Sequence, residues 1–187
     1  IVEFLRRYPD VEVELDLSNE KVDLVADGFD VAVRAGRLTG DRLIARRIFS
    51  ANLACVATPA YLNARGRPDS VEALQHHHCL CSRPNMKWRS VSGEVAVKGR
   101  LTASHLDVQK AAVLQDLGIA VLPRQNVEEA LRSGALEEVL PGMFDIVGGG
   151  VWLVYPESRH VPRKTRAFVD HAVQWFKGNA WRSTSQP

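Results

Sequence analysis

Residues 104–123 predict a helix followed at once by a buried strand. Ser104 and Asp107 are spaced as in a capping-box variant, where a hydroxyl and a carboxylate bind free backbone N–H groups at a helix start. Gly118 is expected to end the helix, and the apolar residues after it predict a short buried strand that stops at Pro123. Such a pair of elements is typical of an open α/β sheet.

A ligand is expected beside the start of this helix. Helix N-termini present N–H groups and a positive dipole end, and both attract an anion. We therefore predict that Ser104 borders a binding cleft, although a serine that only caps the helix is an open alternative. Apolar residues occur on two sides of the helix, with Leu106, Val113 and Leu117 on one side and Val108 on the other. This pattern predicts a helix covered on both sides.

The chain before this segment alternates predicted helices with predicted strands. Residues 1–8 predict an amphipathic helix, residues 11–15 a half-exposed strand, and residues 18–28 a second helix. Residues 30–33 predict the next strand, and this order of elements favours a parallel sheet.

Three later elements have clear signals. Thr58 and Pro59 are a typical helix start. Residues 124–133 predict a helix, and residues 151–155 predict a strand. Residues 162–177 predict a terminal helix whose inner side carries Phe168, Ala172, Trp175 and Phe176.

Composition limits the classes of partner. The net charge is +2 with both signs interspersed, and this argues against nucleic-acid binding by this segment itself. No apolar run approaches the roughly 20 residues that a membrane-spanning helix needs, so no membrane is expected. The three cysteines do not form a secreted disulfide framework, and the reducing cytoplasm is the expected compartment.

The chain contains residue types that can bind a metal, but it lacks the common catalytic motifs. Residues 76–79 (HHHC) and Cys81 contain zinc-ligand types, but neighbours in one short segment cannot easily reach one tetrahedral centre. No nucleophile elbow, phosphate loop, dinucleotide fingerprint or H-E-x-x-H motif is present. The sequence therefore predicts no metal, no cofactor and no catalysis.

Ordered motifs along nearly the whole chain resemble those of LysR-type transcriptional regulators. They read YPDVEVEL, DLVADGFDVAVRAGRL, ARRI, TPAYLNARGRP, HHHCL, GRLTAS, GIAVLP, SGALEEVLP and VYPESR. The resemblance implies the effector-binding domain, an α/β two-lobed fold similar to type 2 periplasmic binding proteins, with a ligand cleft between the lobes.

Two parts of the family pattern are missing here. The N-terminal winged helix-turn-helix and linker helix are absent, so DNA binding is expected only through that missing domain. The first strand of the regulatory domain is also expected upstream of Ile1. The resemblance further implies a homodimer or higher homo-oligomer, in which the helix at residues 2–8 and the strand at residues 11–15 face the mate's second lobe near residues 124–131. Phe4 is expected at this contact.

The candidate effector site combines strand ends and helix starts. Lobe one is predicted as residues 1–51 and 141–187, and lobe two as residues 52–140. Arg34 follows a predicted strand, at the sheet edge where α/β folds bind ligands, with an ion pair to Asp30 or Asp41 as the alternative. The full candidate set is Ser18, Asn19, Arg34, Gly36, Ser82, Arg83 and Ser104.

These groups predict the ligand and the function. Hydroxyls, backbone N–H groups and guanidinium groups all donate to oxygen, so a small organic acid is the expected effector. The leading hypothesis is a non-enzymatic sensor domain of a LysR-type regulator. The alternative is a free-standing solute-binding protein of a transport system.

Overall fold

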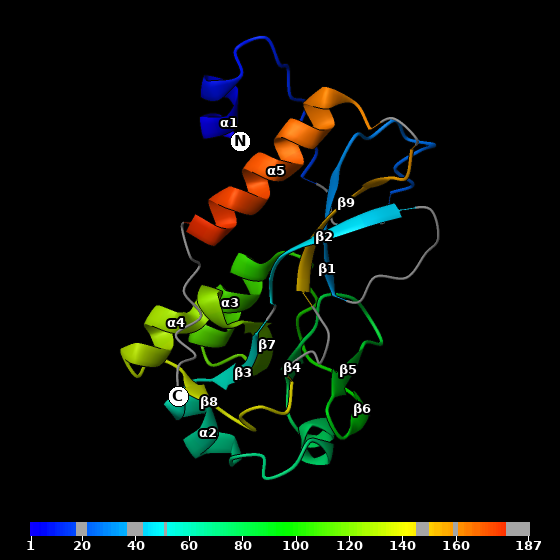
Figure 1. The fold of residues 1–187 in the computed structure, drawn as a ribbon. Helices are drawn as coiled ribbons and strands as arrows, with labels where there is room; N and C mark the ends of the chain where they lie inside the picture. Colours follow the sequence, from blue (N-terminus) through cyan, green and yellow to red (C-terminus); the bar gives the residue numbers. More distant parts are fainter. Residues whose placement is uncertain (18–21, 37–42, 51, 145–149, 159–160, 179–187) are drawn as a thin grey trace. The chain divides into compact units, whose positions relative to one another are not determined.

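Two compact units make up the structure, a computed structural model of the chain (Figure 1). Unit 1 comprises Ile1–Ser50 and Gly148–Pro187, and unit 2 comprises Ala51–Val147. The structure describes all residues except 18–21, 37–42, 51, 145–149, 159–160 and 179–187. Residues 141–144 belong to unit 2 and not to the first lobe, because Phe144 packs edge-on against Trp88 with ring centroids 5.8 Å apart.

The sheet of unit 1 is antiparallel. Strand β9 (Gly150–Pro156) lies between β1 (Ala32–Gly36) and β2 (Leu43–Ser50) and runs opposite to both (Figure 1). The expectation of a parallel sheet is therefore wrong for the described strands of this unit. The order of elements along the chain does not reveal that a distant strand inserts between β1 and β2.

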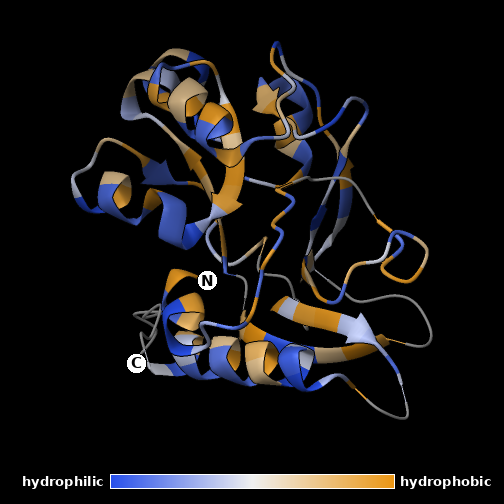
Figure 2. Ribbon diagram, turned by 90° about the horizontal axis from the view of Figure 1, so that it is seen from above, coloured by the Kyte–Doolittle hydropathy of each residue, from blue (hydrophilic) through white to orange (hydrophobic). Residues whose placement is uncertain are grey.

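Two helices complete unit 1. Helix α5 (Arg163–Gly178) packs against the sheet through Val169, which lies with Ile48 and Leu153 in one buried cluster. Figure 2 shows the hydrophobic and hydrophilic residues that alternate along α5, as an amphipathic helix requires. Helix α1 (Val2–Arg7) packs on α5 through Phe4, whose ring centroid lies 5.1 Å from that of Phe168.

Two predicted elements of unit 1 are not formed. Residues 11–17 have no regular structure, because alternating polarity makes a strand only where a partner strand is available. Of the predicted helix at 18–28, residues 18–21 lie outside the described part of the chain and residues 24–28 form turns. The Asp23 carboxylate accepts the N–H groups of Val25 and Ala26, which holds a single turn that ends at Gly28.

The sheet of unit 2 is mixed, in the order β4-β7-β3-β8. Strand β7 (Ile119–Pro123) runs antiparallel to β3 (Leu53–Ala57) and parallel to β4 (Cys79–Leu80), and β8 (Glu137–Glu138) pairs with β3. The buried strand predicted after Gly118 is confirmed as β7. The other elements are α2 (Pro59–Arg65), the 3-10 helix η1 (Glu72–His76), β5 (Lys87–Ser90), β6 (Gly93–Ala96), α3 (Leu106–Leu114) and α4 (Arg124–Arg132).

Helix starts in unit 2 match the sequence in one case and differ in another. Thr58 caps α2 as predicted, because its Oγ1 accepts the N–H of Tyr61 at 3.1 Å. Ser104 does not cap α3: the helix begins one residue later than the capping box requires, so His105 occupies the cap position and makes no side-chain cap bond. The predicted capping box is wrong.

The end and the packing of α3 also differ from expectation. The helix ends at Leu114, and Asp116 adopts the left-handed conformation (φ 59°), so Gly118 is not its stop. Gly118 instead allows a close approach, since a Cβ there would lie 2.1 Å from the carbonyl oxygen of His78. Val108 remains 45% exposed whereas Val113 is 0% exposed, so α3 is covered on one side only.

Candidate effector site

Strand β1 positions two of the predicted residues in unit 1. Arg34 donates from Nη2 to the carbonyl oxygen of Val22 at 2.9 Å. Asp30 accepts from Lys164 at 2.8 Å, so the alternative ion pair between Arg34 and Asp30 is not formed. Gly36 ends the strand with φ 99°, and its carbonyl oxygen accepts the indole N–H of Trp152 at 3.0 Å. Three other groups named from the sequence, Ser18, Asn19 and Asp41, lie outside the described residues.

Unit 2 brings Ser82 and Ser104 to one end of a paired stretch of backbone. Cys81 and Thr102 form a parallel bridge, and the N–H of Ala103 donates to the carbonyl of Cys81 at 2.9 Å. Ser82 and Ser104 follow these residues on adjacent segments. Ser82 Oγ contacts the sulfur of Met86 at 3.2 Å, while Arg83 and Ser104 are exposed.

The first turn of α3 leaves backbone donors without a side-chain cap. The N–H groups of Leu106, Asp107 and Val108 precede the first intrahelical bond, which runs from the N–H of Gln109 to the carbonyl of His105 at 3.2 Å. These donors can bind an acceptor from a ligand or water. The Asp107 carboxylate lies in the same turn and is exposed, so it opposes an anion there.

Gln109 is a positioning residue that the sequence did not single out. Its side chain is 4% exposed, and Nε2 donates to the carbonyl of Ala103 at 2.7 Å. This bond fixes the segment that carries Ser104 against α3. An inward-facing glutamine on an otherwise apolar helix face was the available signal.

Two further residues share a sheet face with Arg34 and were also missed. Trp152 of β9 lies opposite Arg34 of β1 and opposite Arg47 of β2 in the strand register. Residues that lie opposite each other on neighbouring strands point to the same face of a sheet. The sequence alone places these three residues far apart.

A buried polar cluster joins α2 to the segment before β4. Thr58, which is 7% exposed, donates from Oγ1 to Asp116. Tyr61 Oη accepts the N–H of His78 at 3.0 Å and lies 3.3 Å from Nδ1 of His77. Burial lowers the pKa of His77, and the neighbouring His76 and His78 lower this pKa further.

The thiols of Cys79 and Cys81 are protonated and donate hydrogen bonds. Cys79 donates to the carbonyl of Leu74 at 3.5 Å, and Cys81 donates to that of Cys79 at 3.4 Å. Burial raises the pKa of Cys79 to about 12, whereas a zinc ligand must be a thiolate. Among the residues that the structure describes, no three His, Cys, Asp or Glu side chains are grouped to hold a metal.

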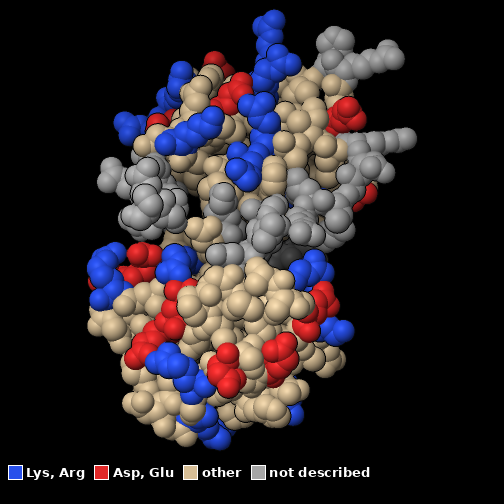
Figure 3. Space-filling model, turned by 60° about the horizontal axis from the view of Figure 1, so that its bottom comes forward, with Lys and Arg blue, Asp and Glu red and all other residues tan. Residues whose placement is uncertain are grey.

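Surface charge is mixed. On the face that Figure 3 shows, most of the surface carries no charge, and Lys and Arg side chains occur together with Asp and Glu side chains. In unit 2, ion pairs such as Arg89–Glu94 at 2.8 Å and Arg124–Glu138 at 2.5 Å neutralise part of the surface charge. No helix among the described residues is both long and apolar enough to cross a membrane.

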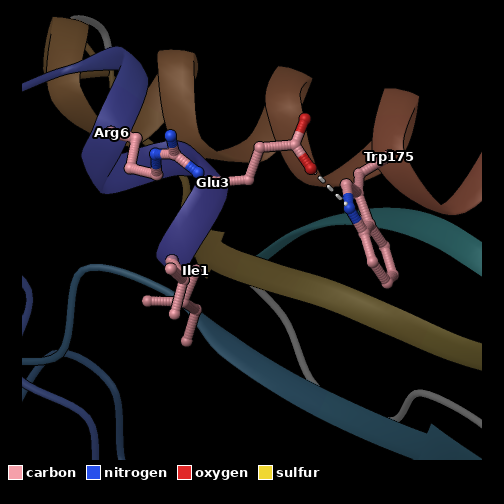
Figure 4. Close-up of a pocket in the computed structure, with 5 residues that line it drawn as sticks. Ile1, Glu3, Arg6 and Trp175 are labelled. Carbon is pink, nitrogen blue, oxygen red and sulfur yellow. Dashed lines mark hydrogen bonds between the residues drawn. The ribbon is translucent and has the colours of Figure 1, made fainter.

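A hollow on unit 1 lies between α1 and α5 (Figure 4). Its lining residues are Ile1, Val2, Glu3, Arg6 and Trp175. Glu3 accepts the indole N–H of Trp175 at 2.9 Å, which ties the two helices together at this point. Val2 is 75% exposed, whereas the neighbouring Phe4 is 1% exposed. Phe4 is therefore a core residue, and the expectation that it lies at a subunit contact is wrong.

The fold defines a mixed α/β protein with two compact units. Comparison with known proteins gives the family. The sequence matches the profile of the LysR substrate binding domain over residues 1–177. The chain belongs to this family.

Named relatives agree with this assignment. The chain is 35% identical over 185 residues to the uncharacterized HTH-type transcriptional regulator YhjC of Escherichia coli, with 94% of this chain and 60% of that protein covered. The full-length virulence activator AphB of Vibrio cholerae has a TM-score of 0.76 and 32% identity, over 93% of this chain and 61% of AphB. The regulatory domain of AphB from Vibrio vulnificus has a TM-score of 0.74 and 30% identity, over 93% of this chain and 89% of that domain.

The comparisons also bear on the alternatives. This chain spans about 60% of the length of YhjC. The matched relatives are transcriptional regulators and not enzymes. They give no support to the alternative of a solute-binding protein of a transport system.

Proposed function

We propose that this chain is the effector-sensing part of a LysR-type transcriptional regulator that acts in the cytoplasm. The family match over residues 1–177 carries this proposal. Because the chain spans only about 60% of YhjC, DNA binding would come from a domain outside it. No catalytic step is proposed.

The proposed effector is a small organic acid. Arg34 and Gly36 of unit 1, with Ser18 and Asn19 before them, would contact it together with Ser82, Arg83 and Ser104 of unit 2. The uncapped N–H groups at the start of α3 and the guanidinium groups support an anion, because all of them donate hydrogen bonds to oxygen.

Effector control follows from linkage. A ligand shifts a conformational equilibrium only by the difference in its affinity for the two states. An effector held by residues of both units would favour one arrangement of the units over another. The attached DNA-binding domains would respond to that shift.

We also propose that the chain forms a homodimer through exposed residues of α1. Val2, at 75% exposure, is an apolar side chain on this helix with little cover in its own unit. Helix α4 of the mate is the proposed partner surface. A two-fold contact is self-complementary, so one substitution would act twice.

Thermal-shift screening of small carboxylates against the 187-residue chain tests the effector proposal. Carboxylates should raise the melting temperature, and uncharged amides of the same shape should not. Ser104→Asp should abolish the gain by repulsion, while Ser104→Ala should retain most of it because Ser104 makes no cap bond. A gain from neutral or cationic compounds that Ser104→Asp does not reduce would contradict the acid assignment.

A further inference from the structure

We propose that Arg47 and Trp152, with Arg34 beside them, bind the acid group and the ring of an aromatic carboxylate on one face of the unit 1 sheet. This inference rests on the proposed function in that the ligand is an organic acid. It adds the chemical class of the acid and two residues that neither the sequence nor the comparisons assign.

The strand register brings these three side chains together. Arg34 of β1 and Arg47 of β2 both lie opposite Trp152, which is on the strand between them. Side chains opposite each other in antiparallel pairs have Cβ atoms about 5 Å apart on one face. A row of cation, indole and cation therefore crosses the middle of the sheet.

The charge of this row is not neutralised by the described part of the chain. Arg47 is exposed, and the carbonyl of Val22 takes one of the five N–H donors of Arg34. No described carboxylate forms an ion pair with either arginine. Four carboxylates of unit 1 have recorded partners elsewhere: Glu3 with Trp175, Asp23 with Val25 and Ala26, Asp27 with the N–H of Asp23, and Asp30 with Lys164.

Trp152 supplies a flat apolar surface in a fixed position. Its indole N–H donates to the carbonyl of Gly36 at 3.0 Å, and the residue is only partly buried. An aromatic ring that stacks on the indole would place its carboxylate within reach of a flanking guanidinium. Aromatic pairs and charge-assisted bidentate bonds both favour such a ligand over an aliphatic or a neutral one.

Gly150 helps to place the Arg47 side chain. A Cβ on Gly150 would lie 3.1 Å from Cδ and 3.3 Å from Cγ of Arg47, so the methylene groups of this arginine lie directly over the glycine. The stem of Arg47 is thus supported by the neighbouring strand. This support limits the rotamers of the side chain and reduces the entropy that binding must remove.

Arg46 provides a matched control. It is the sequence neighbour of Arg47 and is also exposed, but it lies opposite Leu153, whose side chain belongs to the cluster that packs against α5. Arg46 and Arg47 therefore point to opposite faces of one strand. The same substitution at either position removes the same charge, and only the substitution at Arg47 touches the proposed site.

Isothermal titration calorimetry with benzoate, the smallest aromatic carboxylate, tests this inference. The unmodified chain should bind benzoate more tightly than cyclohexanecarboxylate, which lacks the aromatic ring, and should not bind benzamide, which lacks the charge. Arg47→Gln should weaken benzoate binding at least about tenfold, the effect of losing a charge-assisted hydrogen bond. Arg46→Gln should change it less than about twofold, and Trp152→Leu should remove the preference for the aromatic ring.

The outcomes separate this inference from the proposed function. If benzoate binds and Ser104→Asp abolishes binding, but Arg47→Gln and Arg46→Gln behave alike, the Arg47 site is wrong and the acid-sensing function stands. If neither carboxylate binds while a neutral compound does, both the site and the acid assignment are overturned. Arg47→Lys keeps the charge but lacks the bidentate guanidinium, so this variant should bind benzoate with intermediate affinity. It provides a second test of the site if the Arg47→Gln variant does not fold.

Discussion

The two units bury their apolar side chains to different extents. Unit 2 has two large buried clusters, one of which includes the side chains of Val113 and Leu122, both 0% exposed. Unit 1 has a small cluster around Leu153, and it leaves Val33 65% and Val25 71% exposed. Both outer strands of its three-stranded sheet have an edge without a partner in the described structure. Unit 2 should therefore be the more stable unit, and unit 1 the one whose stability depends on additional contacts.

The largest predicted effect comes from a backbone contact in unit 2. Gly118→Ala should cost more than about 4 kcal/mol, because its Cβ would lie 2.1 Å from the carbonyl oxygen of His78 and cannot be accommodated without a shift of β7. Gly134→Ala is the control: Gly134 has φ 75° with open space around it, so it should cost only the left-handed penalty of about 1–2 kcal/mol. Urea unfolding measures both. Equal losses would show that the approach of Gly118 to His78 does not matter.

Core truncations test the difference between the units directly. Leu122→Ala in unit 2 should cost about 3–5 kcal/mol, since this side chain is fully buried in a dense cluster that cannot collapse easily. Leu153→Ala in unit 1 should cost less, about 2–3 kcal/mol, because the small cluster there can relax. Hydrogen exchange at increasing urea concentrations reports each unit separately and should show the Leu153 variant losing unit 1 first. A single transition shifted equally by both variants would remove the distinction.

Self-association should respond to Val2 and not to Phe4. Val2→Asp should raise the monomer fraction in light scattering and change the melting temperature little, because Val2 is 75% exposed. Phe4→Asp should lower the melting temperature, because it places a charge in the contact between α1 and α5. If Val2→Asp leaves a stable dimer unchanged, α1 is not the contact.

The smallest predicted effect is a pH dependence in unit 2. Burial lowers the pKa of His77 below its ordinary value of 6.5, so the unfolded chain takes up the proton first as the pH falls. The stability contributed by neutral His77 is complete above pH 6.5 and is lost as the pH falls from 6.5 through the folded-state pKa. The Tyr61 hydroxyl lies near Nδ1 of His77, and only the neutral imidazole ring can accept a hydrogen bond from it at this nitrogen. Chemical unfolding at several pH values measures this effect. Just below pH 6.5, the free energy of unfolding should fall less steeply with falling pH for His77→Gln than for the unmodified chain.

The sequence predicted local features of the fold better than strand partners. The Thr58-Pro59 helix start and the strand β7 depend on neighbouring residues, and both are confirmed. The antiparallel sheet of unit 1 depends on pairing between Gly36 and Gly150, on strands far apart in the chain. No local pattern reports such a partner, so the predicted parallel sheet and the strand at residues 11–15 both failed.

The residues of the candidate site show the same contrast between local signals and strand pairing. Gly36 is a strand end, but Arg34, which was predicted to follow the strand at residues 30–33, is the central residue of β1, so that part of the prediction is wrong. Arg47 and Trp152 were missed because their proximity to Arg34 results from the register of three strands. The prediction that Ser104 caps α3 is wrong by one residue, because His105 occupies the cap position. A rule based on spacing in the sequence cannot locate a helix start to within one residue.

Hydrogen exchange with and without a bound carboxylate tests the proposal that the chain binds a small acid through β1 and through the first turn of α3. The acid that gives the largest rise in melting temperature would be used at saturation. Slower exchange is predicted both in β1 of unit 1 and in the first turn of α3 in unit 2, with Ser104→Asp abolishing both changes together. Protection confined to one unit, or protection that survives Ser104→Asp, would contradict the proposal.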